Sequence, residues 1–506
     1  MQKLQSSQSI FDLFVVGGGI NGVGIANDAA GRGLSVFLCE KDDLASHTSS
    51  ASSKLIHGGL RYLEHKEFRL VREALAEREV LLAKAPHIIK PMRFIMPHRP
   101  HLRPAWLIRT GLFFYDHLGK RKKLSGSNNV FFKEDSPLQP AITRGFEYSD
   151  CTVDDARLVV LNAMQAREKG AQIMTQTRCV SAKREDGLWL IDLENAHGQF
   201  QIKAKVLVNA AGPWVSQFIR EDVQIKSPYG IRLIQGSHII VPKLHDLDKS
   251  FIMQNDDGRI VFAIPYLDKF TMIGTTDREY DGDPAKVAIT EEEIAYLIKI
   301  SNEHFKAQLQ REDVVSTFAG VRPLCDDESD NPAAITRDYT LSLIQDQADQ
   351  APMLAVFGGK LTTYRKLAES AMKQLRPFFK EKMQASWTAK EALPGGENIT
   401  SIEQLISEVQ EKCVGVSEGL ATRWVNAYGS RVWTMLAHIR KVEDLGYDFG
   451  EGLYSQEVDY LIEHEWARHS ADILWRRSKL GLSFPADKVA ELNHYLAEKI
   501  VALDAA

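Results

Sequence analysis

One stretch near the N-terminus constrains the fold more than any other: DLFVVGGGINGVGIANDAAGRGLSVFLCE, residues 12–40. Its first five residues predict a buried parallel strand, and a helical pattern then continues to about Ala30. A second apolar strand, residues 34–39, ends at an acid, Glu40. Strand, glycine-rich turn, helix, strand and acid in this order predict an α/β fold with a Rossmann-like dinucleotide-binding unit.

The turn after the first strand fits the pattern G-x-G-x-x-G with Gly17, Gly19 and Gly22. Gly17 permits the tight turn, Gly19 lets the backbone approach a pyrophosphate, and Gly22 lets helix and strand pack closely. The helix N-terminus favours the phosphate charge. Glu40 is placed to accept hydrogen bonds from ribose hydroxyls, which argues against NADP but leaves NAD and FAD open.

Length and composition narrow the classes of protein. A chain of 506 residues predicts two to four domains, and a net charge of -5 argues against a general nucleic-acid binder. The five scattered cysteines predict free thiols in a reducing compartment, and no His or Cys spacing predicts a metal site. No signal peptide and no membrane-spanning run is expected. We therefore expect a cytoplasmic protein whose membrane contact, if any, is peripheral.

Three further segments favour FAD. The loop at residues 47–63 is rich in small hydroxyl side chains and can line a flavin, although a flexible serine linker is the alternative. Residues 355–370 predict a strand, two glycines and a helix N-terminus, with Lys360 near a place where negative charge can develop. Residues 205–215 predict another strand and turn at the same cofactor. Because no second G-x-G-x-x-G occurs, one dinucleotide is expected. The predicted cofactor contacts are Gly17, Gly19, Asn21, Gly22, Glu40, Ser50, Ser52, Ser53, Gly58, Gly59, Ala211, Gly212, Gly359, Lys360, Leu361 and Thr362.

Six motifs together carry a family resemblance: GGGINGVGIANDAAGRGL, TSSASSKLIHGGLRYLE, VNAAGPW, GIRLIQGSHI, GVRPL and FGGKLTTYRKLAE. In this order, over nearly the whole chain, they resemble the FAD-dependent respiratory sn-glycerol-3-phosphate dehydrogenases of aerobic bacteria. The resemblance implies a glutathione-reductase-type FAD domain. It also implies oxidation of sn-glycerol-3-phosphate to dihydroxyacetone phosphate by hydride transfer to FAD. Electrons would then pass to a membrane quinone, ubiquinone or menaquinone, at the cytoplasmic face of the inner membrane. A homodimer is possible.

The chain is expected to divide into a discontinuous FAD-binding domain, a β-rich substrate cap and a C-terminal α-helical domain. The FAD-binding parts are residues 1–95, 149–225 and 346–390; a membrane-facing or cap segment is 96–148, the cap 226–345 and the helical domain 391–506. Within the cap, NDDG at 255–258 predicts a hairpin turn. Residues 290–305 predict a helix with a capping box formed by Thr290 and Glu293.

Oxidation of a phosphorylated secondary alcohol needs a base that accepts the hydroxyl proton and residues that position the substrate. It also needs cationic groups that bind the phosphate dianion. Guanidinium groups match phosphate oxygens in a bidentate way. By resemblance, Arg322 and Arg337 clamp the phosphate, and Arg61, Tyr62 and Lys360 lie near the substrate or flavin. His238, in a predicted cap strand, is the expected base, with a hydrogen-bonded core histidine as the alternative. Arg337 could instead pair with its neighbour Asp338.

Residues 99–123 form a segment that is both apolar and strongly basic, in a chain whose net charge is mildly acidic. A helical wheel from Ala105 to Leu118 has Trp106 and Phe113 at the flanks of one broad apolar face, which consists of Leu107, Ile108, Leu112, Phe114, Tyr115 and Leu118. This pattern suits an anionic membrane surface, where a quinone resides. A buried helix and an oligomer contact are the alternatives. The predicted membrane contacts are Arg103, Trp106, Leu107, Arg109, Phe114, Lys120, Arg121 and Lys122.

Three rival functions remain open. An oxidase on the same fold would pass electrons to oxygen and release hydrogen peroxide. An amino-acid or amine oxidase would need a single arginine for a carboxylate. An RNA-binding flavoprotein would use the basic run at residues 120–123, against the acidic balance of the chain.

Overall fold

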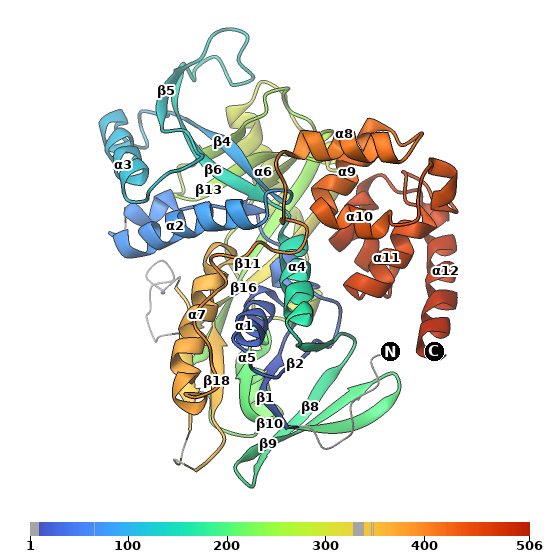
Figure 1. Ribbon diagram of the computed structural model, residues 1–506. Coiled ribbons are helices and arrows are strands. Elements are labelled where there is room, and N and C mark those ends of the chain that lie inside the picture. Colours follow the sequence, from blue (N-terminus) through green and yellow to red (C-terminus); the bar gives the residue numbers. More distant parts are fainter. Residues whose placement is uncertain (1–9, 65, 327–337, 346, 348, 506) are drawn as a thin grey trace.

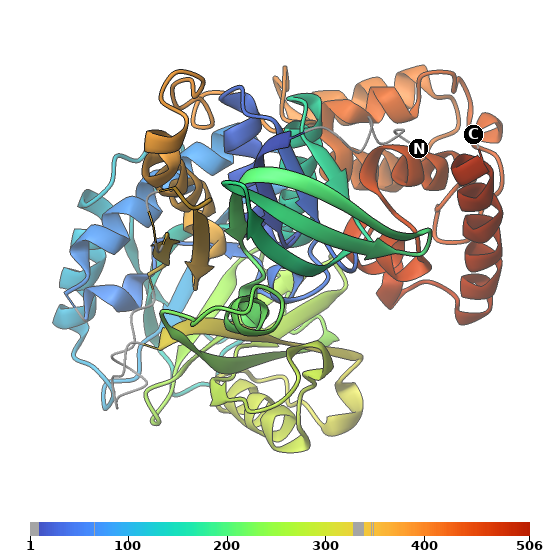
Figure 2. The same ribbon diagram turned by 90° about the horizontal axis from the view of Figure 1, so that it is seen from below.

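Two β-sheets and a helical C-terminal region make up the molecule (Figure 1). The structure is a computed structural model that describes residues 10–64, 66–326, 338–345, 347 and 349–505. The C-terminal helices, coloured orange to red, stand to one side of the two sheets (Figure 2).

The first sheet has a parallel core in the order β18-β10-β1-β2-β7, with β17 antiparallel at one edge and β8 and β9 continuing from β10. Its strands are β1 (Ile10–Val16), β2 (Val36–Cys39), β7 (Gln172–Met174), β8 (Arg178–Glu185), β9 (Leu188–Asn195), β10 (Gly198–Asn209), β17 (Thr340–Ile344) and β18 (Met353–Phe357). The expected strand, helix and second strand are confirmed, with the helix α1 spanning Ile20–Gly31.

Both faces of this sheet are buried, which explains the unbroken apolar runs of its strands. On β1, Leu13 and Val15 point into a core shared with α1, α4 (Asp155–Glu168) and α7 (Tyr364–Leu375). Phe14 points to the other face, where β8, β9 and α5 (Val215–Glu221) supply the packing. The helix α1 lies between α4 and α7 and so aims its N-terminus at one edge of the sheet.

The second sheet follows the order β15-β11-β14-β13-β12-β4-β6-β3, with β16 paired to β11 and β5 to β6. Its strands are β3 (Leu55–Ile56), β4 (Ile89–Pro97), β5 (Asn128–Phe131), β6 (Arg144–Val153), β11 (Gly230–Pro242), β12 (Ser250–Gln254), β13 (Ile260–Tyr266), β14 (Phe270–Gly274), β15 (Arg278–Glu279) and β16 (Ser316–Asp326). The helix α6 (Glu291–His304) covers one face.

Two local predictions in this region are confirmed. The helix α6 begins after Thr290, whose side chain accepts from the backbone of Glu293 while the Glu293 carboxylate accepts from the backbone of Thr290. The NDDG segment turns the chain between β12 and β13, with Gly258 N–H donating to the Asn255 carbonyl at 3.0 Å.

Strand pairing divides the chain differently from the sequence boundaries at several points, including β3, which lies inside the segment 1–95 and pairs with β6 of the second sheet. The strand β4 falls mostly inside the segment 1–95 assigned to the FAD domain, yet it pairs with β6 and β12 of the second sheet. The strand β17 falls inside the segment 226–345 assigned to the cap, yet it pairs with β18 of the first sheet. The strand β4 pairs with segments far away in sequence, which no local pattern reveals, whereas β17 forms an antiparallel hairpin with the next strand, β18.

The helical C-terminal region is confirmed and has its own core. Its helices are α8 (Ile402–Lys412), α9 (Glu418–Tyr428), α10 (Val432–Met435), α11 (Ser455–Glu465) and α12 (Ala486–Ala505), with a π-helical segment, Asp472–Arg477 (η10), after α11. Two more helices, α2 (Phe68–Lys84) and α3 (Ala105–His117), pack side by side at the far end of the second sheet (Figure 1). Among the described helices, none is both long enough and apolar enough to cross a bilayer.

Candidate active site

The glycine-rich turn between β1 and α1 forms as the sequence predicts. Gly17 has φ +107°, and a Cβ added there would lie 2.5 Å from the Ala210 carbonyl oxygen. A Cβ on Gly22 would lie 1.9 Å from the Gly17 carbonyl oxygen. Gly17 and Gly22 therefore let the turn, the helix and the end of β10 approach one another, as close helix packing at such a turn requires.

A cavity of about 640 Å³ opens in front of this turn. Its walls include Gly17, Gly19, Glu40, Ala211 and Gly212, all predicted as cofactor contacts. The structure thus brings together segments near residues 17, 40 and 211 that are far apart in sequence. An elongated hollow at a helix N-terminus suits the pyrophosphate of a dinucleotide.

Glu40 lies at the carboxyl end of β2, on the cavity wall. Its carboxylate accepts from the backbone N–H of Gly18 at 2.6 Å and of Asp42 at 2.9 Å. Burial raises the pKa of Glu40, although these two hydrogen bonds oppose the change. The carboxylate is therefore held in place by backbone donors at the position where a ribose would lie.

The cavity also has an aromatic and cationic wall that the sequence reasoning missed. The Lys41 ammonium lies 4.3 Å from the centre of the Trp214 ring, and His47 meets the same ring edge-on at 4.7 Å. Trp214 belongs to the VNAAGPW motif, so its position directly after the predicted strand and turn was the available signal.

A second loop, between β18 and α7, reaches the dinucleotide turn. The Asn21 side chain donates to the Gly358 carbonyl at 3.0 Å, and Gly359 has φ +102°. A Cβ on Gly359 would lie 2.8 Å from Asn21 Nδ2. The loop therefore needs glycine to pass this close to α1.

Two buried polar atoms beside this second loop have no hydrogen-bond partner among the described residues: Lys360 Nζ and Asn21 Oδ1. Lys360 Nζ lies 4.0 Å from the centre of the Tyr62 ring. Leu361 and Thr362 form the turn that leads into α7, and Thr362 Oγ1 accepts from the His57 backbone N–H at 3.3 Å. Buried polar atoms without partners indicate a place where a polar ligand binds.

The serine-rich loop is ordered and held by side chains, so the alternative of a flexible linker is wrong for the described residues. Ser50 Oγ donates to the His47 carbonyl at 3.3 Å, and Ser52 Oγ donates to buried Asp155 at 2.7 Å. Ser53 Oγ lies 2.9 Å from His238 Nε2. The loop thus connects the cavity wall, the start of α4 and the second sheet.

Gly58 and Gly59 serve the packing of this loop. A Cβ on Gly58 would lie 2.4 Å from the Leu75 side chain and 2.6 Å from the Tyr115 hydroxyl, and Gly58 N–H donates to that hydroxyl at 2.8 Å. Gly59 has φ +72°, and a Cβ there would meet the Tyr62 ring. These contacts come from α2, α3 and the loop itself, not from the cavity.

The pairing of β11 with β16 places two of the predicted substrate-site residues, His238 and Arg322. The pairs Ile234–Arg322, Gly236–Gly320 and His238–Phe318 stand opposite one another. Because side chains alternate along a strand, these residues share one face. The two glycines let neighbouring groups lie directly on the strands: a Cβ on Gly236 would lie 2.6 Å from the Arg322 guanidinium, and one on Gly320 would lie 2.6 Å from Ala51 Cβ.

His238 is 2% exposed and stacks on Phe318 with ring centres 4.6 Å apart. Burial, and then the nearby charges of Lys54 and Arg322, lower the pKa of His238 to about 3. Its Nδ1 is buried without a hydrogen-bond partner among the described residues. The imidazole is therefore neutral near pH 7.

Arg322 points along the same face and its side chain is 40% exposed. It donates to the Thr276 carbonyl at 3.0 Å, and its Nη1 lies 3.6 Å from Asp277 Oδ1. The carboxylate of buried Glu293 accepts from Thr276 at 2.5 Å, from Ser237 at 2.9 Å and from Gln235 at 2.7 Å on the opposite face. The capping box was predicted, but this second role of Glu293 was not.

The other predicted substrate contacts are placed unequally. Arg61 and Tyr62 lie half-buried in the turn Leu60–Leu63, which follows Gly59. Arg337 lies outside the described residues. Its neighbour Asp338 pairs with Arg69 at 2.8 Å.

The structure corrects the helical wheel of the membrane segment. Ile108, Leu112 and Tyr115, assigned to the broad docking face, are buried against the second sheet. Trp106 and Phe113, assigned to the flanks, are 69% and 56% exposed. A helix on a protein surface uses one stripe of its apolar side chains for the core, so only the remaining stripe is free.

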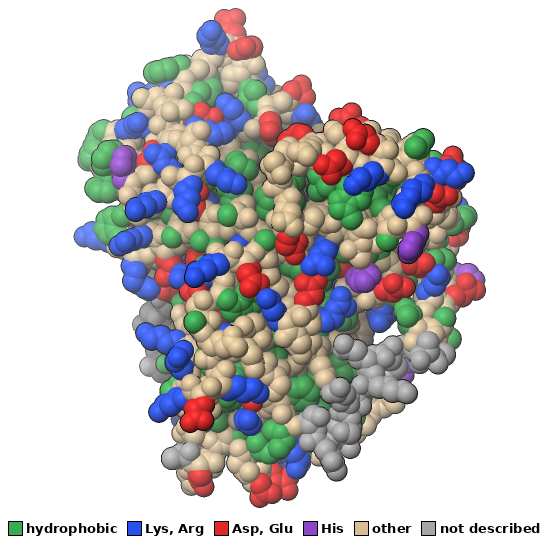
Figure 3. Space-filling model, viewed as in Figure 1, with side chains coloured by type: hydrophobic (Ala, Val, Ile, Leu, Met, Phe, Trp, Pro, Cys, Tyr) green, Lys and Arg blue, Asp and Glu red, His purple; other side chains and the backbone are tan. Residues whose placement is uncertain are grey.

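The exposed stripe forms an apolar patch, which we call the α3 surface: Phe68, Trp106, Leu107, Phe113 and Phe114. Figure 3 shows hydrophobic and basic side chains together at this end of the molecule. Of the predicted basic contacts, Arg103 pairs with Glu64 at 2.8 Å and Arg121 lies 3.3 Å from Asp116. Arg109 is exposed and donates to Ser127 Oγ at 3.0 Å, whereas Lys120 and Lys122 are exposed at the end of the segment.

Comparison with known families matches two parts of the chain. The family described as FAD dependent oxidoreductase matches residues 12–365. The family described as C-terminal domain of alpha-glycerophosphate oxidase matches residues 386–498.

Curated relatives are similar over nearly the whole chain. A glycerol-3-phosphate dehydrogenase of Pseudomonas aeruginosa is 66% identical over 96% of this chain and 95% of its own. An aerobic glycerol-3-phosphate dehydrogenase of Escherichia coli is 56% identical over 96% of this chain and 97% of its own. A D-erythritol 1-phosphate dehydrogenase of Brucella abortus is 51% identical over 92% of this chain and 94% of its own.

Solved structures share the fold. A glycerol-3-phosphate dehydrogenase from Bacillus halodurans complexed with FAD has a TM-score of 0.75 at 26% identity, covering 97% of this chain and 91% of that one. An L-alpha-glycerophosphate oxidase from Mycoplasma pneumoniae with FAD bound has a TM-score of 0.61 at 20% identity, covering 76% of this chain and 100% of that one.

Proposed function

This chain belongs to the FAD-dependent oxidoreductases and, within them, to the glycerol-3-phosphate dehydrogenase family, and from that premise we propose that it oxidises sn-glycerol-3-phosphate to dihydroxyacetone phosphate. The observation that carries the proposal is the shared face of β11 and β16. It presents a neutral imidazole and a guanidinium with two glycines between them, beside the cofactor loops.

The residues present fit FAD. The cavity at Gly17, Gly19 and Glu40 suits the adenosine and pyrophosphate, with Trp214 and Lys41 on its wall. The unpartnered Lys360 Nζ and Asn21 Oδ1 supply polar groups on the second loop. When bound, FAD supplies the acceptor for the hydride that leaves the substrate carbon.

His238 is the proposed base. Its neutral imidazole accepts the proton of the substrate hydroxyl, and Ser53, at 2.9 Å from Nε2, together with the Phe318 ring holds the imidazole in one orientation. A histidine with a pKa of about 3 is a weak base in the resting site. The phosphate dianion of a bound substrate adds negative charge near the ring, which raises the pKa of the imidazole towards a useful range.

Arg322 is the proposed phosphate ligand. Its guanidinium donates to the Thr276 carbonyl, lies near the Asp277 carboxylate and belongs to a half-exposed side chain at the site. A planar guanidinium matches two phosphate oxygens in a bidentate way. By family resemblance Arg61, Tyr62 and Arg337 complete the substrate site.

Anaerobic mixing tests the substrate. We expect sn-glycerol-3-phosphate to bleach the flavin absorbance of the purified protein, and glycerol, which lacks the phosphate, to react far more slowly. D-erythritol 1-phosphate is the second candidate, because a relative at 51% identity carries that name. A flavin reduced by erythritol phosphate and not by glycerol phosphate would contradict the proposed substrate.

The reduced enzyme is proposed to pass its electrons to a membrane quinone, with the protein held peripherally by the α3 surface. Large exposed apolar side chains beside Lys120 and Lys122 support this. Apolar burial contributes about 25 cal/mol per Å², and each basic residue near an anionic leaflet about 1 kcal/mol. An oxidase that releases hydrogen peroxide is the alternative, and a comparison of reoxidation by quinone and by oxygen distinguishes the two.

A triple variant tests the membrane contact. Trp106→Ser, Leu107→Ser and Phe114→Ser should abolish binding to anionic liposomes at high salt, while reduction of a soluble dye by glycerol phosphate survives. The matched control is Lys120→Gln with Lys122→Gln, which should weaken binding mainly at low salt. A triple variant that sediments fully with liposomes at high salt would assign the α3 surface to a protein contact instead.

A further inference from the structure

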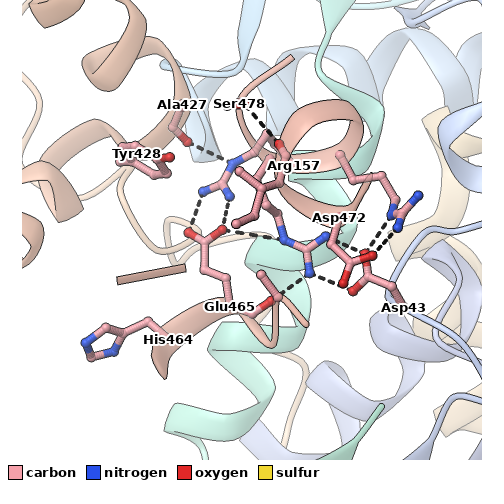
Figure 4. A network of polar contacts seen from close by, with 12 residues as sticks. Asp43, Arg157, Ala427, Tyr428, His464, Glu465, Asp472 and Ser478 are labelled. Carbon is pink, nitrogen blue, oxygen red and sulfur yellow. Dashed lines mark hydrogen bonds and ion pairs between the residues drawn. The ribbon is translucent and has the colours of Figure 1, made fainter. Parts of the chain in front are cut away.

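The C-terminal helices join the nucleotide-binding part through a buried ionic network (Figure 4). Arg157 on α4 pairs with Glu465 at the end of α11, with Nη2 donating to Oε1 at 2.9 Å, and it also donates to the Ala427 carbonyl at 2.9 Å. The Arg157 and Glu465 side chains are fully buried. An ion pair that is buried away from water is stable only when its hydrogen bonds are satisfied. The contact between α4 and α11 is therefore restricted to one well-defined geometry.

The same network extends to Asp43, which follows β2. Arg477 donates to both oxygens of Asp43 at 2.7 Å and to the Glu465 carbonyl at 2.6 Å. Arg476, also in the π-helical segment, donates to Asp43 at 2.6 Å and pairs with Asp472. Burial opposes ionisation of Asp43, but the two arginines lower its pKa below its usual range. Asp43 is therefore ionised and depends on Arg476 and Arg477.

Asp43 belongs to the loop that forms one wall of the FAD cavity. Glu40 and Lys41 before it and Ala45 and Ser46 after it line that cavity. The Ala45 N–H donates to the Gly18 carbonyl of the dinucleotide turn at 3.2 Å. The two arginines thus hold the beginning of the loop at Asp43, between residues that line the cavity.

The far end of the same loop is held from the same C-terminal segment. Lys479 pairs with Asp154 at 3.0 Å, at the start of α4. The next residue, Asp155, accepts from Ser52 at 2.7 Å and from Lys54 at 2.8 Å. Ser52 and Lys54 flank the serine that contacts His238.

We propose that Arg476, Arg477 and Lys479 are positioning residues of the FAD site, and that the C-terminal helical region controls how tightly FAD is retained by clamping the loop of residues 41–54. Without Arg477, Asp43 would be a buried carboxylate with half its partners. The loop would then move towards water to hydrate Asp43, and the cavity wall would open. The inference rests on the FAD dependence of the family and not on the proposed substrate.

FAD release from the holoenzyme tests the clamp. Release is followed as the rise of flavin fluorescence after dilution. We expect Arg477→Met to speed release by roughly 10- to 100-fold, the range of a typical coupling between sites. Hydrogen exchange in residues 41–54 should become faster in the same holoenzyme, a local change that general destabilisation does not produce.

The matched control is Arg423→Met. Arg423 pairs with buried Glu457 at 2.7 Å inside the helical region and contacts no residue of the loop in the described structure. It should lower the melting temperature while leaving FAD release within about twofold, because Arg423 bonds to Glu457 and the Gly452 carbonyl and not to Asp43 or Asp154. Equal FAD release in Arg423→Met and Arg477→Met would overturn the proposal.

If Arg477→Met does not fold, Lys479→Met provides a second test of whether the C-terminal region controls FAD retention. Its side chain is 10% exposed at the edge of the network, so its removal leaves the arginine pairs intact. We expect FAD release to rise by roughly fivefold, at the lower end of site coupling. A folded Lys479→Met protein with wild-type FAD release and wild-type exchange in residues 41–54 would overturn the clamp.

Discussion

The two sheets contribute different kinds of groups to the proposed active site. The first sheet offers backbone: glycines at residues 17, 19 and 22, a helix N-terminus, and a second glycine loop. The second sheet offers side chains: the imidazole of His238 and the guanidinium of Arg322, fixed by the pairing of β11 with β16. A backbone site is encoded in short local spacing, whereas a side-chain site depends on which distant strands pair.

The comparison implies that a change in the second sheet should remove chemistry and spare the cofactor. His238→Asn keeps a polar side chain of similar size but no titratable nitrogen. We expect flavin reduction by glycerol phosphate to slow by roughly 10²- to 10⁴-fold, because a positioned base contributes that much. FAD content should stay at the wild-type level.

Stopped-flow absorbance measures the reduction rate, and the flavin-to-protein ratio is the internal control. His238→Asn reduced at the wild-type rate would show that the buried histidine is a core residue. Loss of FAD together with the rate would show instead that the two halves of the site are not separable.

A change in the first sheet should instead impair FAD binding or folding. Substitutions of Gly19 and Gly22, which belong to one motif, should distinguish these two effects. A Cβ on Gly22 would lie 1.9 Å from a backbone oxygen, so Gly22→Ala should destabilise the protein by about 3 kcal/mol, the upper end of overpacking. Gly19→Ala meets only the Ser49 hydroxyl at 3.1 Å and faces the cavity. It should fold normally and bind FAD weakly.

Chemical denaturation and flavin retention, measured on both variants, distinguish these effects. A Gly19→Ala protein that is as unstable as Gly22→Ala would mean that both glycines serve packing. In that case the cavity in front of Gly19 is not the pyrophosphate site.

A milder change tests the geometry of the second sheet. Arg322→Lys keeps the charge but loses the planar fork and its bond to the Thr276 carbonyl. We expect the concentration of glycerol phosphate needed for half-maximal reduction to rise by roughly 10- to 100-fold, since hydrogen bonds to charged groups contribute about 1.5–3 kcal/mol. Unchanged saturation in Arg322→Lys would move the phosphate site elsewhere.

This contrast explains what the sequence could and could not predict. The dinucleotide turn, Glu40 and the cavity residues near Ala211 follow from motifs within short windows, and the structure places them together. The boundary at β4 could not be predicted, because this strand pairs with β6 and β12, which lie far away in sequence. The boundary at β17 is different, because β17 forms a hairpin with the next strand, β18, so a local pairing was missed there. The carboxylate of Glu293 behind the Arg322 contact was also hidden, because its partners come from two separate segments, β11 and the residues after β14.

The α3 segment shows the same limit at the surface. The helical wheel correctly predicted that this segment is an apolar helix, but it did not predict which side of the helix packs against the rest of the protein. Tyr115 is buried because its hydroxyl donates to Asp150 at 2.7 Å, a partner 35 residues away. Only the pairing of distant elements decides which apolar side chains remain free.

The smallest expected effect concerns the linkage between pH and stability at His238. Its pKa is lowered from 6.5 to about 3 in the folded state, so the folded protein keeps this imidazole neutral while the unfolded chain protonates it below pH 6.5. Stability is therefore fully present above pH 6.5 and is lost as the pH falls towards 3. At pH 5.5 the loss from this residue is about 1.4 kcal/mol, one unit below the unfolded pKa.

His238→Asn removes this proton linkage, and urea denaturation at pH 7.5 and 5.5 measures it. The free energy of unfolding should fall by about 1.4 kcal/mol less in the variant than in the wild type over that interval. Buried His87, whose pKa is also lowered to about 3, is present in both proteins and cancels in the difference. An equal fall in both proteins would mean that folding leaves the pKa of this imidazole at its ordinary value, against the lowered value that the buried site implies. A larger fall in the variant than in the wild type would mean that the imidazole is already charged in the folded state. It could then not accept the substrate proton, and the second sheet would hold a cationic ligand where we place the base.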